Sequence, residues 1–231
     1  MPDNTTTAMT AGESTSFFNT IVSFFQDGGP FMYIILLVFV IGIAITVERF
    51  IYLNLTQTRN QSVWKKLFPL LTQGKFKNAM DEAKKSSSAV AKILVYGLSR
   101  SAYATKHDEI EMAMEEGLME AIPSLERRTH YIATFANIAT LLGLLGTILG
   151  LINAFTAVAN ADPAQKADLL SASISVAMNT TAFGLMAAIP LLLCFTYLQS
   201  KTNQLIDSME MASVKFLNVF RQAQSKQSED A

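Results

Sequence analysis

A group of polar side chains interrupts an otherwise apolar stretch in the C-terminal third of the chain. Their hydroxyl and amide groups can donate and accept hydrogen bonds without carrying a charge. Such groups can line a path for water and ions, and they can equally hold neighbouring helices together inside a membrane. The residue types leave both alternatives open. The group consists of Ser171, Ser173, Ser175, Asn179, Thr180 and Thr181.

The spacing of these residues indicates how much of their helix must avoid lipid. At about 100° per residue, Ser171, Ser175 and Asn179 share one side of a helix, whereas Ser173 and Thr180 lie near the opposite side. An amide facing lipid would lack hydrogen-bond partners. We therefore expect protein or a wet cavity around most of this helix. In a chain with three membrane helices, the other two cannot surround this helix on every side. The pattern therefore predicts a homo-oligomer.

The remaining ionisable and nucleophilic residues argue against catalysis. No carboxylate lies inside an apolar run away from its ends, so the chain lacks the usual group for carrying a proton through a membrane. No intramembrane serine has a nearby histidine or lysine base in the pattern. His107 and His130 are too far apart for a short-spaced zinc motif, and Cys194 is the only cysteine. We expect no enzyme activity, no cofactor and no metal centre, with a transported ion as the exception.

The elements that must position the polar group are membrane helices. Of the 231 residues, 50% are apolar and only 16% are charged, which is unusual for a soluble domain. Uncharged runs occur within residues 29–54, 130–159 and 169–198. Each is long enough to cross the hydrocarbon core as a helix. The expected fold is all-α, an integral membrane protein with three transmembrane helices.

The charges between these spans predict their orientation. Residues 55–129 carry 12 Lys or Arg against 9 Asp or Glu, so the positive-inside rule places this helical loop in the cytoplasm. Residues 160–168 would form a periplasmic loop, and residues 199–231 a cytoplasmic C-terminal helix and tail. The N-terminal segment, residues 1–28, has no Lys or Arg and is expected in the periplasm. Long helices should therefore extend into the cytoplasm.

Residues 1–28 also contain aromatic and aliphatic residues at helical spacing. Phe17, Ile21, Phe24 and Phe25 have Ser, Asn and other polar residues between them. This spacing is typical of a short amphipathic helix on the membrane surface. A lid over neighbouring protein is the alternative.

Two features mark the cytoplasmic ends of the first two spans. Glu48 and Arg49 form an adjacent charge pair at the end of the first apolar run, where they would anchor it at headgroup depth. Pro123 precedes the second run and is expected to bend or break the helix that enters it.

Small residues in the second span predict a packing face. Gly143, Gly146, Thr147, Gly150 and Ala154 recur at offsets that place them along one side of a single helix. Residues without bulky side chains let membrane helices approach closely and gain dispersion contacts. We assign Gly143, Gly146, Gly150, and Gly184 in the third span to helix packing.

Several segments together resemble one known family. They are GPFMY and VERF around the first span, LERRTHYIATFANIATLLGLLGTILGLINAF through the second, and TTAFGLMAAIP in the third. With the three-span layout, they resemble the MotA/TolQ/ExbB proton-channel family over roughly residues 29–200. The three spans and short cytoplasmic loop are more similar to the ExbB and TolQ members than to the four-span MotA type.

The resemblance implies a pentamer in the bacterial inner membrane around a dimer of single-span partners similar to ExbD or TolR. In this family, ion flow drives work in the periplasm or at the outer membrane, such as TonB-dependent uptake with a TonB-like protein. The partner's intramembrane Asp is the usual ion carrier. The pore-facing threonines of the family motif correspond here to Thr147 and Thr181. No nucleic acid partner is expected, given a net charge of -1.

The chain departs from the family pattern at one position of the third span. Val176 stands where ExbB and TolQ commonly have Glu, five residues before Thr181. The coupling ion is therefore either H⁺ or Na⁺, because neutral oxygens also suit a hard cation. We predict that Ser175, Asn179, Thr180 and Thr181 contribute to the ion path. A non-conducting oligomeric scaffold is the alternative function.

Overall fold

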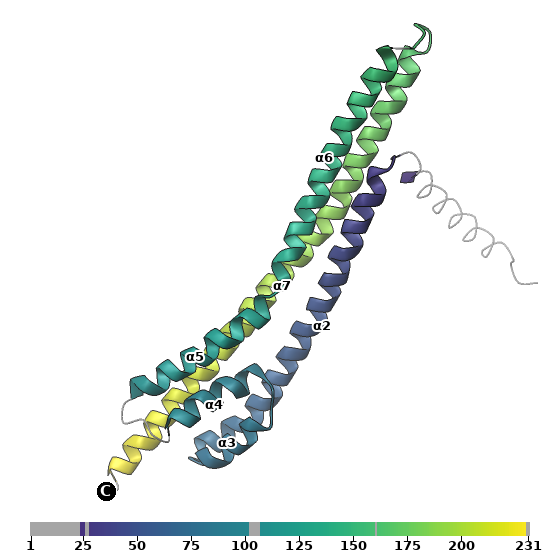
Figure 1. The fold of residues 1–231 in the computed structure, drawn as a ribbon. Coiled ribbons are helices and arrows are strands. Elements are labelled where there is room, and N and C mark those ends of the chain that lie inside the picture. Colours follow the sequence, from purple (N-terminus) through teal and green to yellow (C-terminus); the bar gives the residue numbers. More distant parts are fainter. Residues whose placement is uncertain (1–23, 26–27, 102–106, 160, 230–231) are drawn as a thin grey trace, which may run out of the picture. The chain divides into compact units, whose positions relative to one another are not determined.

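The computed structural model describes residues 24–25, 28–101, 107–159 and 161–229, and its elements are all helices over these ranges. The expected all-α fold is confirmed. Along the chain the elements are α2 (Phe31–Thr72), α3 (Phe76–Lys84), α4 (Ala89–Ser101), α5 (His107–Glu126), α6 (Thr129–Ala159) and α7 (Lys166–Glu229) (Figure 1).

Three helical stretches are long and apolar enough to cross a membrane, as the sequence predicted. They lie in α2, in the stretch Asp108–Ala159 that ends with α6, and in α7. Both α2 and α7 continue well beyond their apolar runs, since α2 has 42 residues and α7 has 64. About 20 residues suffice to cross the hydrocarbon core.

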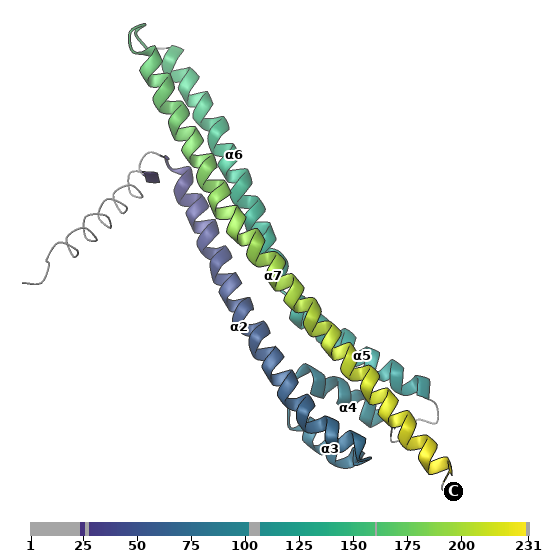
Figure 2. The same cartoon turned by 180° about the vertical axis from the view of Figure 1, so that it is seen from behind.

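The chain divides into two compact units, one formed by residues 1–45 and 131–194 and the other by residues 46–130 and 195–231. In the first unit, α6 and the N-terminal part of α7 run side by side (Figures 1 and 2). Small side chains such as Ala136, Ala139 and Ala177 are buried there. Large apolar side chains, including Leu141 and Phe155, point outward. This arrangement is typical of membrane helices, which pack through small residues.

Only the end of the N-terminal segment can be compared with the predicted interfacial helix, because residues 1–23 lie outside the described residues. Phe24 and Phe25 are helical, and their rings pack edge-on against Phe183 of α7, with centroid distances of 6.4 and 4.9 Å. Such edge-to-face pairs are favourable because the ring edge and ring face carry opposite partial charges. These two rings therefore cover protein.

The second unit contains the remainder of α2, helices α3, α4 and α5, and the C-terminal part of α7. Apolar residues that recur every three or four positions form its core, as expected for amphipathic helices. Phe216 of α7 is fully buried, and so is Leu125 near the end of α5. The other large buried side chains include Leu53, Leu67, Leu71, Ile93, Leu94, Ile110 and Met114.

The helix break expected at Pro123 is displaced along the chain. α5 continues through Pro123 to Glu126, and the interruption lies at Arg127 and Arg128. Pro123 removes one helical hydrogen bond, but its position is exposed, so water can solvate the carbonyl that loses its partner. Arg128 instead has a φ of 69°, a left-handed conformation that stops the helix.

Candidate functional site

Thr181 links α7 to α6 through its hydroxyl. The Oγ1 atom donates a hydrogen bond to the carbonyl oxygen of Gly143 at 2.8 Å. The two backbones approach closely here, because a Cβ on Gly184 would lie 2.8 Å from the carbonyl oxygen of Ala139 and 3.0 Å from the Cα of Gly143. The hydroxyl of Thr181 thus forms an interhelical hydrogen bond of the kind that stabilises membrane helix pairs.

Thr180 is buried in the same contact region. Its Oγ1 lies 2.8 Å from the carbonyl oxygen of Gly28 and 2.9 Å from that of Val176, so its single proton is shared between two acceptors. A Cβ on Gly146 would lie only 2.4 Å from the Cγ2 of Thr180. The methyl group of Thr180 therefore occupies the space that the glycine leaves open.

The predicted packing glycines lie along the contact between α6 and α7. A Cβ on Gly150 would lie 2.7 Å from the Cβ of Ala177, and a Cβ on Gly143 would lie 3.2 Å from the Cα of Gly184. Ala154, the last member of the predicted small-residue face, is fully buried. Any larger side chain at these glycines would have to displace a neighbour.

Ser175, Val176 and Asn179 lie on a different part of α7, which we call the outer face. Ser175 is exposed, Asn179 is half-buried and Val176 is 36% exposed. Among the described residues, no hydrogen bond joins Ser175 or Asn179 to a partner. Two polar groups of an apolar helix are therefore left available for groups outside this chain.

Thr147 is separate from the other predicted pathway residues. It is half-buried on α6, and its Oγ1 donates to the carbonyl oxygen of Leu144 in the same helix at 2.6 Å. No hydrogen bond connects it to Thr181 within the described part of the chain. The structure thus brings Thr180 and Thr181 into the helix contact, while Thr147, Ser175 and Asn179 remain partly or fully exposed.

Sequence reasoning missed two further polar groups in the second span. Asn137 and Asn153 are both exposed on α6. An exposed amide in an apolar helix requires a partner from water, headgroups or another chain. Their signal was present in the sequence as two amides within the uncharged run of residues 130–159.

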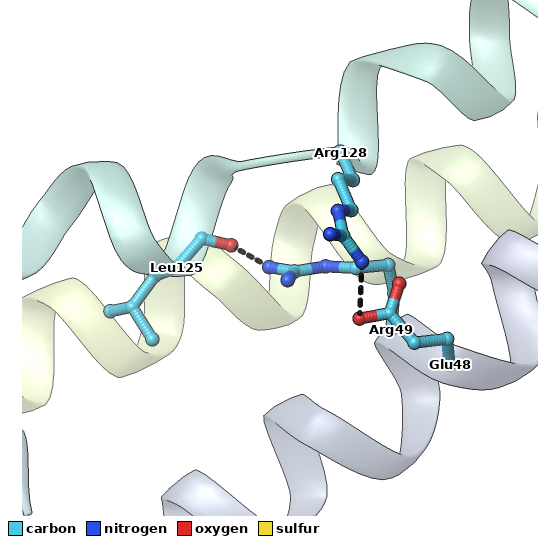
Figure 3. Close-up of polar contacts among 4 residues, drawn as sticks. All are labelled: Glu48, Arg49, Leu125 and Arg128. Carbon is cyan, nitrogen blue, oxygen red and sulfur yellow. Dashed lines mark hydrogen bonds and ion pairs between the residues drawn. The ribbon is translucent and has the colours of Figure 1, made fainter.

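Arg49, which the sequence predicted as an anchor at headgroup depth, contacts the end of α5. Its side chain is 3% exposed, and its Nη2 donates to the carbonyl oxygen of Leu125 (Figure 3). The guanidinium also lies over the ring of Tyr52, 4.8 Å from the centroid. Leu125 is the second-to-last residue of α5. The last carbonyl groups of a helix have no backbone N–H partner, and Arg49 supplies a hydrogen bond to one of them.

Glu48 pairs with the residue that stops the helix. Its Oε1 lies 3.4 Å from the Nη1 of Arg128, and both side chains are exposed (Figure 3). An exposed pair of this kind contributes little to stability. Neighbouring residues of α2 thus contact the end of α5 and the turn that follows it. Sequence spacing gave no signal of these contacts, which join residues about 80 positions apart.

These features define a membrane protein built from long helices, with neutral polar groups inside its third span. Among the described residues, no cluster of three or more His, Cys, Asp or Glu could hold a metal ion. The polar groups in the span are hydroxyls and an amide, which suit helix contacts or ion passage.

The chain belongs to the MotA/TolQ/ExbB proton channel family, whose model matches residues 85–211, more than half of its length. It is similar to an ExbB homolog described as a biopolymer transport protein from Methanothermobacter thermautotrophicus, with 28% identity over 198 residues, covering 85% of this chain and 69% of that protein. It is also similar to the Tol-Pal system protein TolQ of Haemophilus influenzae, at 35% identity over 91 residues, 39% of this chain and 40% of TolQ. A third relative, the biopolymer transport protein ExbB1 of Vibrio cholerae, is 49% identical over 53 residues, 23% of each chain.

Proposed function

We propose that this chain is the channel subunit of an ion-driven energy-coupling complex in a bacterial inner membrane. The complex would drive work in the periplasm or at the outer membrane, such as TonB-dependent uptake with a TonB-like protein. The observation that carries this proposal is the outer face of α7, where Ser175 and Asn179 have no hydrogen-bond partner among the described residues. In lipid, such groups would cost free energy, so they require water, an ion or another chain.

The proposed assembly supplies the groups that this chain lacks. Residues 131–159 and 169–198 contain no Asp or Glu. Proton transfer through these spans would therefore need a carboxylate from a partner. We propose a homopentamer around a dimer of ExbD/TolR-like single-span subunits, each supplying an intramembrane Asp.

The coupling ion is H⁺ or Na⁺ in this proposal. With Val176 in place of the Glu common in the family, the third span offers only neutral oxygens. Ser175 and Asn179 would contact the ion or its water directly. Thr147 and Thr181 would contribute lone pairs, because a hydroxyl that donates one hydrogen bond can still accept others.

The orientation follows from charge. The excess of Lys and Arg in residues 55–129 favours the cytoplasm for this segment. With three spans, the N-terminus would lie in the periplasm and the C-terminus in the cytoplasm.

A non-conducting membrane scaffold is the second candidate. The geometry of Thr180 and Thr181 favours it, because both hydroxyls already bond to carbonyl oxygens within the chain. In a scaffold, Ser175 and Asn179 would bond to neighbouring subunits and conduct nothing.

The test is ion flux into proteoliposomes that contain this chain and its single-span partner, under separately imposed H⁺ and Na⁺ gradients. Asn179→Ala removes the amide from the outer face, and Met178→Ala is the matched control at an exposed apolar position of the same helix. Replacing the partner's acid gives the second control. The assembly of each variant is checked by its size in detergent.

Channel function predicts flux that depends on the partner's acid and falls at least several-fold in Asn179→Ala but not in Met178→Ala. Flux of H⁺ alone would assign the titrating group to the partner, whereas flux of Na⁺ would make the neutral oxygens its ligands. An intact complex without flux under either gradient would favour the scaffold.

A further inference from the structure

Lys201 of α7 is held in a defined position between two helices. Its ammonium group donates to the Oδ1 of Asn54 in α2. It also lies 5.7 Å from the ring centroid of Phe50 and 6.0 Å from that of Tyr197, and the two rings stack with their centroids 6.2 Å apart. The side chain is half-buried. A lysine side chain in water is usually flexible, but here these contacts hold the ammonium group in one position.

This cation lacks a counter-ion within the described chain. The ion pairs of the described residues involve other side chains, and none includes Lys201. An ammonium group has three N–H donors, and the amide oxygen of Asn54 accepts only one of them. Ring faces attract a cation but do not replace a hydrogen-bond acceptor. The site therefore has a charge and donors available for an anion.

Its place in the sequence is the end of two apolar runs. Phe50 follows the uncharged residues 31–47, and Lys201 follows the apolar run that ends at Leu198. Phe50 and Tyr197 are large rings that are 46% and 54% exposed. Exposed aromatic rings beside a lysine at the end of a span are typical of the headgroup region of a bilayer.

One helical turn further on, the same two helices and Val90 of α4 line a pocket of about 240 Å³. Gln57 follows Asn54 by three residues, and Gln204 follows Lys201 by three. Both line the pocket, together with Asn60, whose side-chain Nδ2 is buried without a partner among the described residues. The lining combines Lys215 and amide or hydroxyl groups with apolar side chains such as Met211, and it contains no carboxylate among the described residues. The pocket thus adds hydrogen-bonding groups without negative charge beside Lys201.

We propose that Lys201, Asn54 and the rings of Phe50 and Tyr197 form a binding site for the phosphate of an anionic phospholipid head group. The ammonium would pair with the phosphate, while the stacked rings would contact the glycerol and upper acyl region. The amides of Gln57 and Gln204 would meet the polar end of the head group. A zwitterionic lipid would bind more weakly, because its own cation opposes the charge of Lys201.

The experiment measures lipid selectivity of the full chain with its partner in vesicles of phosphatidylcholine. Spin-labelled phosphatidylglycerol and spin-labelled phosphatidylcholine are added in turn, and electron paramagnetic resonance gives the fraction of each held at the protein. Lys201→Gln removes the charge. Lys65→Gln is the matched control, because it removes the same charge from an exposed position of α2.

We expect the wild type to prefer phosphatidylglycerol, and Lys201→Gln to lower this preference about fivefold, the effect of one lysine near a membrane surface. Lys65→Gln should leave it unchanged, and Lys201→Arg should retain it. Tyr197→Leu, which keeps the charge and removes one ring, should weaken it and provides a second test if Lys201→Gln fails to fold.

Three results would overturn the proposal. They are equal preference in the Lys201→Gln and Lys65→Gln variants, no preference in the wild type, or displacement of phosphatidylglycerol by soluble inorganic phosphate. The last result would assign the site to a free anion. None of these results depends on ion flux. The lipid site and the channel function can therefore be refuted independently of each other.

Discussion

The hydroxyl of Thr181 lies 2.8 Å from the carbonyl oxygen of Gly143 and joins α7 to α6 beside the close contact of Gly184 with Gly143. This bond uses the single proton of the hydroxyl and leaves oxygen lone pairs free to accept from water or contact a cation. Packing and ion passage therefore do not exclude each other at this residue. Measuring both helix stability and ion flux, in variants with and without the hydroxyl, can distinguish them.

Thr181→Val should lower both helix stability and coupled ion flux, whereas Thr181→Ser should retain most of each. Valine keeps the branched shape and removes the hydroxyl, at a cost of about 0.5–1 kcal/mol for an interhelical hydrogen bond in a membrane. Stability is measured by unfolding in mixed detergent micelles, and flux in proteoliposomes. A valine variant with reduced stability and full flux would limit the residue to packing.

Gly184→Ala should weaken the pairing of α6 and α7. The new Cβ would lie 2.8 Å from the carbonyl oxygen of Ala139, a backbone atom that cannot move without shifting its helix. Overpacking of this kind costs about 1–3 kcal/mol. The measurement is the midpoint of unfolding in detergent. Ala182→Ser, at an exposed position of the same helix, is the control and should unfold like the wild type.

Arg49→Met should destabilise the end of α5. It leaves the carbonyl oxygen of Leu125 without its side-chain donor, and an unsatisfied buried acceptor costs about 1–3 kcal/mol. The comparison is with Arg127→Gln, which removes a charge from an exposed position in the turn after α5. Hydrogen exchange of the α5 amides should accelerate only in Arg49→Met. Equal exchange in both variants would contradict a capping role for Arg49.

Tyr96 should ionise at higher pH than an ordinary tyrosine. Its hydroxyl donates to Glu120 at 2.6 Å, and this hydrogen bond, together with the negative charge of the carboxylate, raises the pKa of Tyr96. Because the pKa is raised in the folded state, the stabilisation is fully present below the usual tyrosine pKa of about 10 and is lost as pH rises through the raised value. This group should therefore cause no change of stability with pH near neutrality.

The check on Tyr96 is an ultraviolet titration of tyrosinate, with Tyr96→Phe subtracted to isolate one ring. Glu120→Gln should bring the pKa back toward its usual range, because the carboxylate charge is removed. A pKa for Tyr96 that stays the same in Glu120→Gln would show that Glu120 is not the cause.

Local periodicity was enough to predict much of this protein. Long uncharged runs predicted the three apolar helices, and the spacing of Gly143, Gly146 and Gly150 placed them on one face of the second. These are properties of a single helix, in which residues three or four apart share a side whatever lies opposite. The same reasoning found the polar group of the third span, but it left packing and ion passage undecided.

Only the tertiary structure decided which faces meet. It paired Gly184 with Gly143, bonded Thr180 to Gly28, left Asn179 on the outer face, and placed the carbonyl of Leu125 beside Arg49. It also moved the helix break from Pro123 to Arg128. The pairings depend on contacts between residues far apart in the chain, and the position of the helix break depends on whether the hydrogen bond lost at Pro123 faces solvent. The spacing of residues along one helix contains neither kind of information, so the pattern alone could not predict these features.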